Sequence, residues 1–152
     1  MANCEDFKEL AEQHRKTAEI LMKAGDNPGA AYMLGYVLEF ALKAAACKTL
    51  HLLTYPESGG NEKISSFFKA HNHDQLIMIA GLWDLFDANR GTAAAQRNWS
   101  NFTSAYLGEW TRMRYDKDLR KQFDKKKVKS LYNSLIGAPD GIIPIIDKNK
   151  RW

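Results

Sequence analysis

The sequence predicts a single all-α domain, an up-and-down bundle of four to five helices followed by an extended C-terminal tail. Apolar residues recur at steps of three and four along most of the chain, and no segment alternates polar and apolar residues as a half-buried strand does. The length of 152 residues, with 45% hydrophobic and 26% charged side chains, fits one packed domain. We therefore assign residues 1–137 to the bundle and residues 138–152 to the tail.

The first two predicted helices form an antiparallel pair. The apolar face of the first helix begins at Phe7, with Asn3 as its expected cap and Gly25 as its expected left-handed end. Asn27 and Pro28 then supply a cap and a first-turn proline for the second helix. Because the joining loop is very short, the two helices must run in opposite directions. Small residues on the second helix permit close backbone approach: Ala31, Gly35, Ala41 and Ala45.

The second helix is the least polar stretch of the chain, yet we expect no membrane span. Glu39 and Lys43 lie near the middle of residues 29–47, and a charge at the centre of a span costs about 2.5–3.5 kcal/mol. The N-terminus lacks the basic and apolar regions of a signal peptide, and Cys4 and Cys47 are too few for a multi-bridge disulfide framework. These features favour a protein of the reducing cytoplasm.

The second half of the chain predicts three more helices. After a polar loop at residues 54–63 and a short helical turn at residues 64–68, a third helix is expected from residues 71–74 to Gly91. Its apolar positions are Leu76, Ile79, Ala80, Trp83 and Phe86. A fourth helix carries an aromatic stripe, interpreted as core rather than as a cofactor site: Trp99, Phe102, Tyr106 and Trp110. The last helix is expected over Asp124 to Ile136.

The tail is apolar but interrupted by prolines. Residues 138–146 contain Pro139 and Pro144, which predicts an extended strap packed on the bundle or on a partner.

Positive charge is concentrated in one segment. Residues 112–129 contain nine basic and three acidic residues, a local charge of +6, although the whole chain carries only +4. The remaining residues are therefore slightly acidic. This asymmetry favours a local anion-binding surface over a generally basic protein.

Three short motifs resemble the HEPN family of helical domains. Residues 39–44 read Glu-Phe-Ala-Leu-Lys-Ala and resemble the Glu-x-x-Leu-Lys-Ala pattern of the family's small-residue-rich helix. His73-Asp-Gln-Leu76 resembles the His-Asp-Leu element that opens the third helix, with one residue inserted. Arg114-Tyr115 resembles the Arg-Tyr motif that closes the fourth helix. The resemblance covers residues 5–136 and keeps the family's motif order.

The resemblance implies a compact bundle that binds nucleotides or RNA and often dimerises. It further implies a toxin–antitoxin, phage-defence or nucleotidyltransferase-partner setting. Ribonuclease members carry an Arg followed after four to six residues by His, whereas no histidine follows His73 here. We therefore expect a module without catalysis and without a cofactor. The alternative is a metal-independent ribonuclease with an atypical centre, using Arg114 and His73.

The binding residues expected from the sequence come from the basic segment and the second helix. They are Arg112, Arg114, Tyr115, Lys117, Lys121 and Lys43. Arginines and lysines bind phosphate by forked and point-charge contacts, and Tyr115 offers a face for a base. Lys43 shares a helix face with Glu39 and is placed in the same cleft.

Other interpretations of these residues stay open. Arg114 can instead pair with Glu39 across the bundle and fix its packing, leaving no free charge for a ligand. Four residues have zinc-ligand spacing within each pair, although we expect no metal site: Cys47, His51, His71 and His73. In a third hypothesis the chain is a protein-interaction module that docks a partner through residues 142–146 and the aromatic helix.

Overall fold

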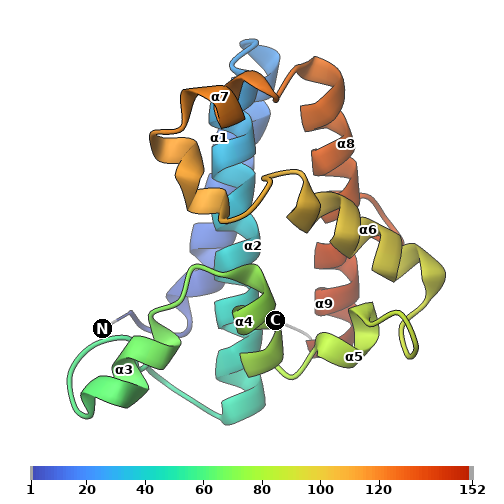
Figure 1. The fold of residues 1–152 in the computed structure, drawn as a ribbon. Coiled ribbons are helices and arrows are strands. Elements are labelled where there is room, and N and C mark those ends of the chain that lie inside the picture. Colours follow the sequence, from blue (N-terminus) through green and yellow to red (C-terminus); the bar gives the residue numbers. More distant parts are fainter. Residues whose placement is uncertain (1, 151–152) are drawn as a thin grey trace.

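The computed structural model describes residues 2–150, which form an all-α bundle (Figure 1). Nine α-helices and one 3-10 helix follow one another in this part of the chain, and its only β-type pairing is an isolated bridge between Asn3 and Thr54. Four α-helices have twelve or more residues: α1 (Asp6–Lys23), α2 (Asn27–Leu50), α6 (Ala93–Ser104) and α8 (Lys125–Ile136). The predicted all-α fold class is confirmed.

Helix α2 is the centre of the bundle. It packs against α1, α4, α8, α9 and the 3-10 helix η1, and most of its residues are buried. By length and composition α2 is apolar enough to cross a membrane, but 78% of its most apolar window is buried inside the protein. Helix α2 is therefore a buried core helix of the bundle, as Glu39 and Lys43 near its centre predicted.

The α1–α2 hairpin forms as predicted, with different caps. Gly25 has a φ of 81° and ends α1 in the left-handed conformation. Helix α2 is capped by Asp26, whose side chain accepts the Gly29 amide at 3.0 Å, so the assignment of the cap to Asn27 is wrong. Asn3 is also not the cap of α1, because its side chain accepts only from the Glu5 amide, outside the helix.

The predicted third helix is broken into shorter pieces. The chain forms α3 (Glu62–Phe68), α4 (His73–Ile79) and α5 (Trp83–Phe86). Gly81, with a φ of 70°, separates α4 from α5. Leu76 and Phe86 still reach the core, whereas Trp83 is 39% exposed and was wrongly expected to face inward.

The predicted fourth helix also ends early. Helix α6 stops at Ser104, and Leu107 and Gly108 have positive φ values of 52° and 126° that turn the chain. Trp110 therefore lies on η1 (Trp110–Arg114) rather than on the helix of Trp99. The aromatic stripe is buried, as expected, but it comes from separate elements.

The C-terminal tail is helical, so its assignment as an extended strap is wrong. Helix α9 (Ile142–Lys150) contains Pro144 in its first turn, where the missing N–H removes no intrahelical hydrogen bond. Ile142 and Ile146 are fully buried, and α9 packs against α2 and α8. Helices α8 and α9 thus follow one another along the same side of α2 (Figure 1).

Candidate functional site

The basic segment occupies η1, α7 (Lys117–Lys121) and the start of α8, at the end of the bundle where α1 meets α2 (Figure 1). Six of its cationic side chains are exposed, and we call them the basic surface: Arg114, Lys117, Lys121, Lys125, Lys126 and Lys129. They are spread over three consecutive elements of the chain. The surface is therefore open to a ligand larger than a single phosphate.

Tyr115 adds an aromatic group to the basic surface. It follows η1 directly and is 71% exposed, the most exposed aromatic residue among the large hydrophobic side chains of the described chain. Its neighbour Arg114 is also exposed, and the Arg114 Nε donates only a long hydrogen bond of 3.4 Å to the Thr111 carbonyl. An exposed ring beside a cation is the combination that binds a nucleobase and its phosphate.

Arg112 holds the segment together instead of facing a ligand. Its guanidinium donates to the Leu107 carbonyl and to the Asp116 carboxylate, both at 2.7 Å. The Leu119 amide and this guanidinium keep the pKa of Asp116 below its usual range. The structure therefore places Arg112 in a local support role, although the sequence made it a binding candidate.

The first turn of α8 carries lysines at an unfavourable place. Asp124 caps the helix by accepting the Lys127 amide at 2.8 Å, and Lys125, Lys126 and Lys127 follow with no acidic residue in that turn. The N-terminal end of a helix is the positive end of its dipole, so each cation there is destabilising by about 0.3–1 kcal/mol. A bound anion relieves this repulsion.

Lys43 lies in a buried ion cluster and does not join the basic surface. It is 4% exposed, and its Nζ contacts Glu39 Oε1 at 3.0 Å and Glu57 Oε2 at 3.2 Å. The same Nζ lies 5.3 Å from the centre of the Tyr55 ring. The proposed pair between Arg114 and Glu39 is wrong, because Glu39 is 2% exposed and contacts Lys43 and His71.

His73 is a core histidine. Its Nε2 donates to the Gly35 carbonyl at 3.0 Å, and its ring stacks on Trp110 with an interplanar angle of 3°. Burial lowers its pKa to about 4. The contacts of His73 are with Gly35, Phe102 and Trp110, whereas Arg114 contacts Thr111, so the structure does not pair the two residues proposed for catalysis.

His71 is the histidine whose ring is oriented by a carboxylate, and the sequence indicated it only through the zinc spacing. Its side chain is 52% exposed, and its Nδ1 donates to Glu39 Oε1 and Oε2 at 2.9 and 3.1 Å. The Trp110 Nε1 donates to the His71 carbonyl at 2.7 Å and fixes its backbone. A carboxylate on Nδ1 leaves Nε2 as the proton-accepting nitrogen. The sequence did offer one indication of this pair: Glu39 lies among apolar residues of the second helix, and a buried carboxylate needs a hydrogen-bond partner.

A pocket of about 280 Å³ adjoins this imidazole. His71, His73 and Trp110 line it together with Tyr106 and Glu109. Its rim contains none of the six cations of the basic surface. The described residues thus contain two separate chemical features, an open basic surface and a small pocket beside an oriented imidazole.

The structure does not support the zinc hypothesis or the docking hypothesis. Cys47 is bonded to Cys4 in a disulfide, so its sulfur is not the zinc ligand considered above. Residues 142–146 belong to α9, and Ile142 and Ile146 are buried in the core instead of being presented to a partner.

Comparison with known proteins gives no relative for this chain. No family model matches it, and neither the curated proteins nor the solved structures contain a match. Its function is therefore inferred from the basic surface and the His71 pocket themselves.

Proposed function

We propose that this protein is a HEPN-like module that binds single-stranded RNA through the basic surface and does not cleave it. The observation that carries the proposal is that six exposed cations and the exposed ring of Tyr115 lie on one continuous segment of the chain, residues 114–129. Cations that neutralise phosphates release counterions, and an aromatic face stacks on a base of any sequence. Together they fit a flexible single strand.

The distribution of charge favours a polymer over a mononucleotide. The cations lie on three consecutive elements, η1, α7 and α8, and do not converge on one cavity. A pocket of about 220 Å³ at this end is lined by Arg112, Asp116 and Asp118, among others. Its two carboxylates repel a phosphate, and Asp116 already engages Arg112. A nucleotide pocket therefore fits poorly here, whereas a strand across the surface can contact several exposed cations at once.

Equilibrium binding of a fluorescent oligouridylate tests the proposal. The triple variant Arg114→Ala, Lys117→Ala, Lys121→Ala should bind much more weakly and reduce the salt slope by about 0.7 for each phosphate that no longer pairs with a cation. Tyr115→Ala should cost about 1–3 kcal/mol, which is about 5- to 150-fold in affinity, by removing the stacking interaction.

Two other exposed lysines provide a control for the loss of charge itself, to be compared with the double variant Arg114→Ala, Lys117→Ala. Lys63 and Lys69 are exposed on and beside α3, away from η1 and α7 (Figure 1). The double variant Lys63→Ala, Lys69→Ala lowers the net charge without touching the basic surface. Affinity that falls equally in the control and in the basic-surface variant refutes the proposed site.

RNA cleavage is the second candidate function, and one observation favours it. The Glu39–His71 pair orients an exposed imidazole in the way that a general base requires. If the protein cleaves RNA, His71→Gln should abolish cleavage and leave affinity unchanged, whereas His73→Gln should preserve activity. Absence of cleavage by the wild-type protein supports the binding module.

The proposal includes the cytoplasmic setting that the cysteine count and the N-terminal sequence favour, and the homodimer that the family resemblance implies. Light scattering after gel filtration measures the subunit number with and without RNA. A monomer under both conditions removes the dimer from the proposal and leaves the basic surface to be tested alone.

A further inference from the structure

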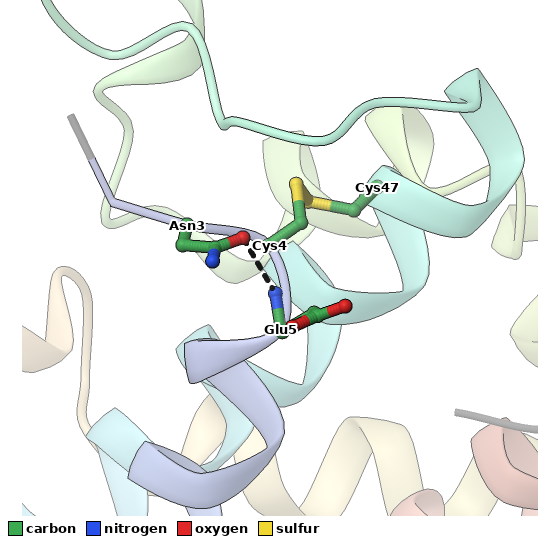
Figure 2. Close-up of a disulfide and its surroundings, with 4 residues drawn as sticks. All are labelled: Asn3, Cys4, Glu5 and Cys47. Carbon is green, nitrogen blue, oxygen red and sulfur yellow. Dashed lines mark hydrogen bonds between the residues drawn. A yellow bond between two sulfur atoms is a disulfide. The ribbon is translucent and has the colours of Figure 1, made fainter.

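A disulfide joins the start of the chain to the end of the central helix. Cys4 precedes α1, Cys47 lies in the last turns of α2, and their Cα atoms are 5.9 Å apart (Figure 2). Two cysteines in a protein expected in a reducing compartment gave no reason to predict the bond. The structure thus raises the question of what the bond controls.

The disulfide lies at the wall of an open groove. The groove has a volume of about 820 Å³ and is lined by Cys4 and Cys47 together with Lys8, Lys48 and His51. Cys4 is partly exposed, whereas Cys47 is only 4% exposed. An attacking thiol therefore reaches the Cys4 sulfur first.

The disulfide also secures the cover of the buried ion cluster. Cys4 N donates to the Leu53 carbonyl at 2.9 Å, and Tyr55 N donates to the Ala2 carbonyl at 3.0 Å. These two bonds align residues 2–4 with residues 53–55. Tyr55 then lies over Lys43, and Glu57 contacts the Lys43 ammonium.

The buried ring of Tyr55, which packs against Phe7 and Phe68, anchors the covering segment, but other parts of the segment are less well held. Leu53 is 85% exposed, and the buried Tyr55 hydroxyl has no hydrogen-bond partner in the described residues. An unsatisfied buried hydroxyl is destabilising, so the segment needs the tether more than a well-paired loop does.

We propose that Cys4 and Cys47 form a reversible redox pair that exchanges with a small thiol peptide of the glutathione type. The redox state of the pair controls how firmly residues 2–5 and 53–57 cover the Lys43–Glu39 cluster. This inference is independent of RNA binding, because the groove and the basic surface share no residue.

The exchange takes two balanced steps. A peptide thiolate attacks the Cys4 sulfur and forms a mixed disulfide, while the Cys4–Cys47 bond breaks and its electron pair leaves on the Cys47 sulfur, which takes a proton. A second peptide thiolate then attacks the peptide sulfur of the mixed disulfide and releases the Cys4 thiolate, which also takes a proton. The protein gains two electrons and two protons, and two peptide thiols become one peptide disulfide.

Reduction of the folded wild-type protein by glutathione tests the access. We expect the rate, followed by mass spectrometry of alkylated thiols, to be independent of guanidinium at concentrations below the unfolding transition. A rate that rises exponentially with guanidinium from the lowest concentrations would show that the bond opens only by global unfolding, and would overturn the proposal.

Two single variants test the order of attack. Incubated with oxidised glutathione, the Cys4 thiol of Cys47→Ser should form a mixed disulfide about tenfold or more faster than the Cys47 thiol of Cys4→Ser, because exposure controls the exchange rate. Equal rates, with both variants folded by circular dichroism, contradict attack at Cys4. Should either variant fail to fold, the wild-type kinetics above decide the matter.

Hydrogen exchange tests the coupling to the cover. In the reduced wild-type protein the amides of Cys4 and Tyr55 should exchange about tenfold or more faster than in the oxidised protein, because the tether that limits local opening is gone. Amides that fray at the ends of α8 exchange by local opening and not by global unfolding, so they serve as the internal control and should change little. Unchanged exchange at Cys4 and Tyr55 would show that the disulfide does not control the cover.

Discussion

Lowering the pH from 7 to 5 should destabilise the fold by about 2 kcal/mol through one buried imidazole, that of His73. Burial lowers its pKa from 6.5 to about 4, and its Nε2 donates to the Gly35 carbonyl. Between these two values the unfolded chain binds a proton that the folded protein does not. Stability must therefore fall as the pH drops through 6.5, and the loss is complete once the pH is below the folded pKa.

The magnitude follows from the two pKa values. At pH 5 the unfolded imidazole is almost fully protonated and the folded one is about a tenth protonated, which corresponds to about 2 kcal/mol. Below pH 4 the contribution levels off at about 3 kcal/mol. Urea unfolding at a series of pH values, followed by circular dichroism, measures the slope.

The variant His73→Gln isolates this contribution. Glutamine retains an amide donor for the Gly35 carbonyl but loses the ring that stacks on Trp110, so the free energy of unfolding should be lower at pH 7. Because glutamine does not titrate, the free energy of unfolding should also change less between pH 7 and 5. His51→Gln, which removes an exposed imidazole outside the core, serves as the control substitution. An unchanged slope in His73→Gln would refute the assignment of the pH dependence to His73.

Three other perturbations test the packing. The Cys4–Cys47 disulfide joins cysteines 43 residues apart in sequence. Its reduction should destabilise the protein by about 4 kcal/mol and lower Tm by about 8–16 °C in calorimetry. An unchanged Tm would contradict this expected loss of stability. Lys43→Met leaves the buried Glu39 carboxylate with His71 as its remaining partner and should cost about 3–5 kcal/mol in urea unfolding. RNA affinity at a temperature where the variant is folded should stay within about twofold, because Lys43 does not join the basic surface. Gly35→Ala places a methyl group in the Trp110 indole and should cost about 1–3 kcal/mol, with a stability equal to wild type as the contradicting result.

Periodicity predicted the fold where the pattern is local. The α1–α2 hairpin and α8 follow from apolar spacing, and Gly25 ends α1; both signals act within a few residues of their own position. The breaks at Gly81 and at residues 107–108 were missed because apolar spacing continues across them. After residues 107–108 the chain turns, and Trp110 contacts Gly35 from η1 instead of from α6. The position of this turn depends on tertiary packing, which apolar spacing does not report.

The candidate site, like the fold, could be predicted from the sequence only in part. The charge of residues 112–129 is a property of the sequence, so the basic surface could be predicted, including Arg114 and Tyr115. The partners of Arg112, Lys43 and His71 could not, because each pairing depends on which carboxylates and carbonyls lie within reach after folding. The prediction of an extended tail was wrong for a local reason. A proline breaks a helix only beyond the first turn, and Pro144 lies in the first turn of α9.

Mapping the RNA footprint on the folded protein tests the central claim most directly. In a titration of the isotope-labelled protein with oligouridylate, followed by NMR amide shifts, we predict that the largest changes fall at residues 114–129, with Tyr115 among them. Shifts concentrated instead around the pocket of His71 and Glu109, or spread evenly over the molecule, would contradict RNA binding by the basic surface.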